Sequence, residues 1–150
     1  MSDVDFGTDP LLGWRVWLLL ETDEGVRLSS VVYRELWPVR APAQVRCVEG
    51  RCLGATWPNV GHSCGIHAFK ERAQALDFPA HWEAVRVPLA RFPDTYVVGQ
   101  VSLWGRVSEH EAGYRAQYAY PYSLVVPARL EAMASGLRSA YRVDVEVTTG

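Results

Sequence analysis

The sequence carries no excess of positive charge. It has 15 Lys and Arg residues against 17 Asp and Glu residues, which gives a formal net charge of -2 at pH 7. The sequence pI is about 6.1. A chain with this balance has no net positive field that would attract nucleic acid or anionic lipid. We therefore expect a protein or a small molecule as the partner, and neither nucleic acid nor a membrane.

A secretion signal and a membrane span are also missing. The first residues, MSDVDFGTDP, are acidic and lack the basic start of a signal peptide. The apolar run LLGWRVWLLL contains Arg15 and is far too short to cross a bilayer. Both observations favour a cytoplasmic protein.

Cysteine is scarce, and its number is odd. The chain has 3 cysteines. Because thiols stay free in a reducing compartment, a disulfide framework is not expected, and the cysteines favour a metal site or a reactive thiol. One disulfide between Cys47 and Cys52 is a further alternative.

Linkers, internal repeats and low-complexity tracts are absent as well. No stretch rich in Gly, Ser and Pro divides the 150 residues, of which 49% are hydrophobic. A chain of this length and apolar content buries roughly two thirds of its unfolded surface around one core. We therefore predict a single domain over residues 1–150, with residues 1–10 as a flexible arm.

Apolar alternation predicts a first hairpin. In the segment GWRVWLLLE, Trp14, Val16 and Leu18 share one face of a strand, and Trp17 and Leu19 are apolar on the other. Two apolar faces are typical of a central strand. Turn residues follow, and VRLSSVVYREL is then predicted to return as an antiparallel partner.

A second hairpin is predicted from YVVGQVSLWGRVSEH and GYRAQYAYPYSLVV, which both have strand composition. We expect a three-residue loop between them, in which Gly113 takes the left-handed conformation of a bulge. This loop would place His110 opposite Tyr114, and Glu109 opposite Arg115 as an ion pair.

Two helices and a closing strand complete the predicted fold. Helical spacing in CGIHAFKERAQAL predicts a helix that is capped by Ser63 and closed by Pro79, with Cys64 in its first turn. A second helix, ARLEAMASGLRSAY, follows Pro127, and YRVDVEV alternates as a last strand. We therefore predict an α+β domain with a curved, largely antiparallel sheet and two helices.

Five sulfur and imidazole groups gather in CVEGRCLGATWPNVGHSCGIHAF. Structural zinc takes four ligands of these types, often from a turn and a nearby helix start. Cys47 and Cys52 are close enough to chelate one ion, and Cys64 and His67 would share a face of the predicted helix. These four residues form a candidate zinc site, with His62 as the alternative ligand. In the competing interpretation the cysteines pack as small apolar side chains.

Cys64 alone supports another hypothesis, a cysteine-dependent enzyme. The positive end of a helix dipole lowers the pKa of a thiol and makes its thiolate available as a nucleophile. His110 is the candidate base, with Glu109 or Glu111 to orient it. The sequence does not decide whether the protein is an enzyme.

Aromatic residues gather on the second hairpin and suggest a small-molecule carrier. The tyrosines that alternate onto one face of their strand, close to Trp104, are Tyr114, Tyr118, Tyr120 and Tyr122. Such rings commonly fill the core of a curved sheet, but they can also line a pocket at its open end. Gly99 and Gly105 indicate bulges, sharp coiling or close approach by another backbone.

Two stretches of the sequence fit the patterns CGIYA and LWGxVxEHxxGYRAxxAYP. The matching residues are Cys64, Gly65, Ile66 and Ala68, then Leu103, Trp104, Gly105, Val107, Glu109, His110, Gly113, Tyr114, Arg115, Ala116, Ala119, Tyr120 and Pro121. Together they resemble a bacterial family, chiefly actinobacterial, that has no known activity. The resemblance implies kinship and little chemistry. The family pattern has tyrosine where this sequence has His67, which weakens the hypothesis that His67 is a zinc ligand. The resemblance also implies that the Cys64 segment and the hairpin tip belong to one recurring arrangement.

Our leading prediction is a binding or adaptor domain in which Cys47, Cys52 and Cys64 organise a loop, with zinc as the hypothetical cofactor. The first alternative is an enzyme with Cys64 as nucleophile and His110 as base. The second is a small-molecule carrier that uses the aromatic face of the sheet.

Overall fold

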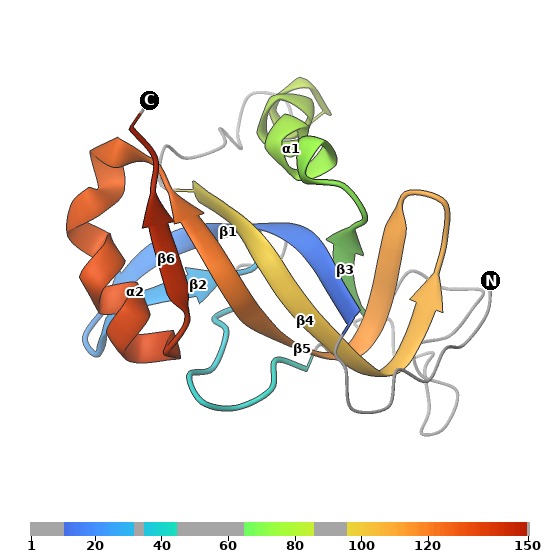
Figure 1. Cartoon of the computed structure of the whole chain (residues 1–150), viewed down its shortest axis with the longest axis horizontal. Coiled ribbons are helices and arrows are strands. Elements are labelled where there is room, and N and C mark those ends of the chain that lie inside the picture. Colours follow the sequence, from blue (N-terminus) through green and yellow to red (C-terminus); the bar gives the residue numbers. More distant parts are fainter. Residues whose placement is uncertain (1–10, 32–34, 45–64, 86–95, 150) are drawn as a thin grey trace.

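The computed structural model shows a curved six-stranded sheet with a helix packed on either side (Figure 1). It describes residues 11–31, 35–44, 65–85 and 96–149. The predicted fold class is confirmed: one α+β domain with a largely antiparallel sheet and two helices. No helix within these ranges has the length and apolar character needed to cross a bilayer. The predicted arm of residues 1–10 lies outside them.

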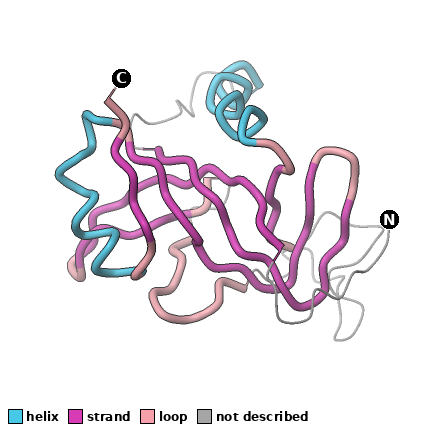
Figure 2. Tube along the Cα trace, in the orientation of Figure 1, coloured by secondary structure: helices cyan, strands magenta, loops and turns pink. Residues whose placement is uncertain are grey.

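The strands belong to one sheet, as the tube in Figure 2 shows. In chain order the elements are β1 (Leu11–Thr22), β2 (Gly25–Ser29), β3 (Ile66–Phe69), α1 (Arg72–Val85), β4 (Tyr96–Glu109), β5 (Gly113–Val126), the 3-10 helix η2 (Ala128–Met133), α2 (Ala134–Tyr141) and β6 (Asp144–Val147). β1 pairs with β4 and β4 with β5, both antiparallel, whereas β6 pairs with β5 in parallel.

β1 is central, as its two apolar faces predict. Trp17 and Leu19 belong to the larger core on the α2 side of the sheet. Val16 and Leu18 belong to a smaller cluster that includes Ala75 of α1. β2 returns antiparallel to β1 and confirms the first hairpin.

The four-residue strand β3 closes part of the sheet into a ring. It pairs with β5 along its length and meets β1 where Phe69 lies opposite Trp14. Small residues make this closure possible. A Cβ atom added at Gly13 would lie 2.7 Å from the Cβ of Ala68, and one added at Gly113 would collide with the Ala68 carbonyl oxygen. β1, β4, β5 and β3 therefore surround the core at this end.

The prediction of a helix that begins at Cys64 is wrong in its first part. Residues Ile66–Phe69 form the strand β3, and α1 begins only at Arg72. Ile66 is buried and the next residue, His67, is exposed, which is the period of a strand. Pairing with β5 satisfies backbone groups on both segments, and this outweighs the local helical spacing. α1 also continues past Pro79, where the helix was predicted to end.

The β4–β5 hairpin is confirmed, but its predicted register is wrong by one residue. His110 and Gly113 exchange backbone hydrogen bonds of 2.9 and 3.3 Å, so the loop between them has two residues instead of three. Glu109 therefore faces Tyr114 and does not face Arg115. The shorter loop is possible because Gly113 lies in extended backbone, where it packs closely against β3.

The other two glycines of the hairpin mark irregularities, as the sequence predicts. Gly105 has a φ of 78° and lies where the pairing shifts between Trp104 and Val107. Gly99 precedes a second shift, and an added Cβ would collide with the carbonyl oxygen of Ser123. These positions bend the hairpin around the core.

The closing strand is confirmed as β6, and the second predicted helix is confirmed as α2 from Ala134, whereas its first six residues form the 3-10 helix η2. Leu130 and Leu137 are buried, and Met133 and Ala140 pack against the same core. η2 and α2 therefore present the predicted apolar side to the sheet, while β6 adds one parallel strand beyond β5.

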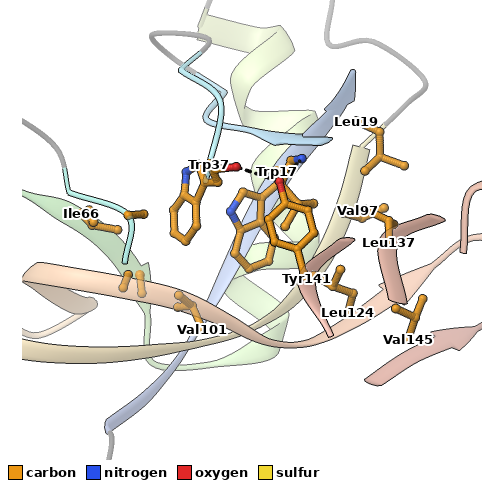
Figure 3. Packing of buried hydrophobic residues seen from close by; sticks show 14 of the residues in the cluster. Trp17, Leu19, Trp37, Ile66, Val97, Val101, Leu124, Leu137, Tyr141 and Val145 are labelled. Atoms are coloured by element: carbon orange, nitrogen blue, oxygen red, sulfur yellow. Dashed lines mark hydrogen bonds between the residues drawn. The ribbon is translucent and has the colours of Figure 1, made fainter. Parts of the chain in front are cut away.

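One buried hydroxyl group joins three parts of the fold. Tyr141, which ends α2 and is 1% exposed, accepts a hydrogen bond from the Leu28 N–H at 2.8 Å. It donates to the Trp37 carbonyl at 2.9 Å, the bond drawn in Figure 3. The Trp37 ring meets the Trp17 ring edge to face at 5.3 Å. α2 is thereby tied to β2 and to the segment 35–44.

Tyr141→Phe should leave the Leu28 N–H and the Trp37 carbonyl without these partners. Each unsatisfied buried group costs about 1–3 kcal/mol, so we expect the free energy of unfolding to fall by roughly 2–4 kcal/mol in urea denaturation. Tyr122→Phe is the matched control, because Tyr122 is 51% exposed. An equal loss in both variants would contradict the role of the Tyr141 hydroxyl.

Candidate functional site

A cavity of about 230 Å³ opens beside the segment 35–44. Its lining residues come from the end of the first hairpin and from this segment: Ser30, Glu35, Leu36, Trp37, Pro38, Pro42, Ala43 and Gln44. Leu36 is 46% exposed and Trp37 is 2% exposed. The lining therefore runs from the protein surface into the core.

The walls of the cavity are held by backbone pairing. The Trp37 N–H donates to the Leu28 carbonyl at 2.8 Å. Further along, Ala43 and Ala119 exchange hydrogen bonds of 2.8 and 3.2 Å, which fixes the segment to β5. Two anchored ends and two prolines between them leave the segment little freedom.

Arg15 lies behind this lining. Its Nη2 donates to the Ser30 Oγ at 3.2 Å, and its Nη1 donates to the His67 carbonyl oxygen at 2.5 Å. The guanidinium carbon is 5.0 Å from the centre of the Trp37 ring. Burial lowers the pKa of Arg15 to about 10, so the side chain is still protonated at neutral pH. A cation is therefore built into the back of the cavity wall.

The hairpin tip forms a second polar region. The Lys70 Nζ lies 2.8 Å from the Glu109 Oε2 and 5.6 Å from the centre of the Tyr114 ring. Partial burial lowers the pKa of His110, and the positive charges of Arg115 and Lys70 lower it further. His110 is therefore neutral at neutral pH, as a general base has to be.

The zinc hypothesis mostly concerns residues outside the described ranges, namely Cys47, Cys52, His62 and Cys64. His67 is described and is exposed on β3. In the part of the chain that the structure describes, no three His, Cys, Asp or Glu side chains are grouped so that they could hold a metal. The zinc site and the Cys64–His110 pair stay predictions.

The helix that the hypothesis assumed to follow Cys64 is nevertheless wrong in its described part. His67 lies on the strand β3, and α1 begins only at Arg72. Cys64 itself lies outside the described residues. The Cys64 segment and the second hairpin, which the resemblance joins, are in contact where they are described, because Ile66 pairs with Ala116 across β3 and β5.

The aromatic residues of the second hairpin divide between different contacts. Trp104 and Tyr118 stack at 6.0 Å with 28° between their planes, and Tyr122 is 51% exposed. The Tyr120 hydroxyl donates to the Tyr141 carbonyl at 2.9 Å. None of these residues lines the 35–44 cavity, so the carrier hypothesis in its predicted form gains no support from it.

The residues of this cavity were not among the predicted site residues. Ser30 and Trp37 carry no local motif, and only tertiary contacts bring them together with Arg15. One signal was present in the sequence: Arg15 interrupts a strand that is apolar on both faces.

Comparison of the chain with protein-family models, with curated proteins and with solved structures finds no match.

Replacement of Lys70 by Gln should raise the pKa of His110 toward its ordinary value of 6.5, because one of the charges that lower it is removed. A pH titration of the His110 ring by NMR measures this. Arg72→Gln is the control, because the Arg72 guanidinium lies 5.7 Å from the Trp14 ring and is not a cause of the shift.

The lowered pKa of His110 also predicts how the stability of the protein changes with pH. Near pH 6 the unfolded chain binds more protons at residue 110 than the folded protein does. His110 therefore decreases the free energy of unfolding as the pH falls through 6.5. This decrease should be smaller in Lys70→Gln, because the pKa of His110 is lowered less there. A wild-type midpoint at or above 6.5 would contradict the assigned environment.

Proposed function

We propose that the chain is a binding domain for a small ligand, and that the cavity beside the segment 35–44 is its binding site. The observation that carries the proposal is the cavity itself, which joins an exposed leucine to a buried tryptophan. Its volume of about 230 Å³ lies below the 300–1,000 Å³ that is usual for drug-sized ligands. It therefore suits a small molecule or one side chain of a partner.

The chemistry of the lining supports binding. Binding sites are mostly apolar and carry a few polar groups that orient the ligand. Here Leu36, Trp37 and Ala43 supply apolar surface, and Ser30 and Gln44 supply polar groups. Such a lining can hold a small apolar body and fix one polar end of it.

The lining also favours binding over catalysis. Among the described residues that line the cavity, only Glu35 is ionisable, and it is exposed. General acid–base chemistry needs a group whose pKa lies near the working pH, and nucleophilic chemistry needs an activated hydroxyl, thiol or amine. The described lining residues bring no such pair together. The enzyme hypothesis would require Cys64, which lies outside the described residues, and His110, which does not line the cavity.

Preorganisation supports the proposal as well. The Trp37 side chain donates from Nε1 to the Ser30 Oγ at 2.9 Å, while its backbone is held by Leu28 and Tyr141. The Arg40 N–H donates to the Tyr120 hydroxyl at 3.0 Å. Because the walls are already ordered, a ligand loses little free energy in ordering them.

A fragment screen tests this function. With ¹⁵N-labelled protein, we expect at least one of phenol, benzyl alcohol, butyrate and benzoate to shift the Trp37 indole N–H signal at millimolar concentration. Leu36→Ala removes about 1 kcal/mol of apolar contact and should weaken that fragment roughly fivefold.

Leu76→Ala is the matched control, because Leu76 is 53% exposed and lies on α1, on the other side of the sheet. It should leave the affinity unchanged. The proposal fails if none of the four fragments moves the Trp37 signal, or if both leucine variants weaken binding equally.

A further inference from the structure

Arg15 is a half-buried cation that has no acidic partner among the residues the structure describes. Its hydrogen-bond acceptors are a serine hydroxyl and a backbone carbonyl, which are both neutral. Its Nε is buried and has no hydrogen-bond partner. Removing a charge from water is costly unless an opposite charge lies close by. The site therefore favours any anion that reaches it.

Ser30 connects this cation to the cavity. Its Oγ accepts from the Arg15 Nη2 and from the Trp37 Nε1, at 3.2 and 2.9 Å. A hydroxyl has two acceptor lone pairs and one proton, so these two bonds leave the proton as the remaining polar group. Within the described ranges, no acceptor takes it. Two donors, one of them charged, also polarise the hydroxyl and make it a stronger donor.

Ser30 lines the cavity from a protected position. Ser30 is 8% exposed and belongs to the lining. A hydrogen bond formed there is shielded from water and is stronger than one at the surface. An anionic oxygen at this point would lie close to the guanidinium and would still touch the apolar wall of Trp37.

The charge of the ligand is limited by Glu35. This residue also lines the cavity, and its side chain is exposed. A phosphate dianion would be repelled by its carboxylate more strongly than a monoanion would. A planar carboxylate on a small organic body fits the one donor, the one cation and the apolar wall.

We propose that the cavity binds the carboxylate group of a small organic monoacid, with the Ser30 hydroxyl as the donor and the Arg15 guanidinium as the counter-charge. This inference rests on the proposed binding function and names its ligand class. It uses no residue outside the described ranges.

Benzoate and its neutral analogue benzamide provide the test at constant ionic strength. The Trp37 indole N–H signal again reports binding to the full chain. A charge-assisted hydrogen bond in a shielded site favours the carboxylate over the amide roughly tenfold or more. We therefore expect benzoate to bind at least tenfold more tightly than benzamide.

Two variants test which residues cause the preference for benzoate over benzamide. Arg15→Met should reduce this preference to about threefold or less. Its control is Arg27→Met, because Arg27 lies on β2, has Glu24 at 3.7 Å and does not line the cavity.

Ser30→Ala should also remove most of the preference for benzoate. Its control is Ser123→Ala, which should keep the preference, because the Ser123 hydroxyl bonds Gln100 and does not line the cavity. The comparison of benzoate with benzamide in the wild-type protein needs no variant and stands even if one variant fails to fold.

Each outcome decides between the two proposals. If benzamide binds as tightly as benzoate, the carboxylate inference is overturned and the binding function stands. If inorganic phosphate shifts the Trp37 signal more strongly than benzoate does, the ligand class is wrong. If no fragment shifts it, both proposals are overturned. A benzoate preference that persists unchanged in Arg15→Met also overturns the inference.

Discussion

The arrangement of the core depends on the hydroxyl group of Tyr141. This group accepts from the backbone of β2 and donates to the Trp37 carbonyl, so one atom fixes α2 to two segments that lie more than 100 residues earlier in the sequence. Burial raises the pKa of Tyr141, which keeps its proton available for the donated bond. Trp37 is thereby held against Trp17, and the Trp37 indole in turn holds the Ser30 hydroxyl. Trp37 and Ser30 both line the cavity, so part of its wall is held by these contacts.

The elements with a clear period were predictable, because burial imposes that period on the residues. β1 has two apolar faces and is central, and the apolar side of ARLEAMASGLRSAY faces the core. β3 was not predictable in the same way. Its four residues carry a weak pattern, and their conformation is decided by the edge of β5 and by the small residues Gly13, Ala68 and Gly113 that let three backbones approach. Local spacing favours a helix, and tertiary pairing overrides it.

The hairpin tip shows how one glycine can have two explanations. Gly113 was expected to supply a left-handed residue for a three-residue loop, yet its backbone is extended, and the missing side chain makes room for the Ala68 carbonyl. Within the described hairpin β4–β5, the glycine with a positive φ is Gly105, at the bulge. A sequence cannot separate these uses, because both require only that the Cβ is absent. The one-residue error in register, and the Glu109–Arg115 pair that depended on it, follow from this ambiguity.

The candidate site was beyond prediction because Ser30, Trp37 and Arg15 are joined only by the fold, but one of them was conspicuous. An arginine in a strand with two apolar faces has no place in ordinary core packing. Arg15 bridges β1 to the backbone of β3 and to Ser30 through two of its donors, and its charge is partly stabilised by the Trp37 ring at 5.0 Å. A neutral side chain could make the same bridge at a lower desolvation cost. The Trp37 ring cannot replace an opposite charge, and a small anion in the cavity on the other side of Ser30 would supply one, which is the reason for the proposed ligand class.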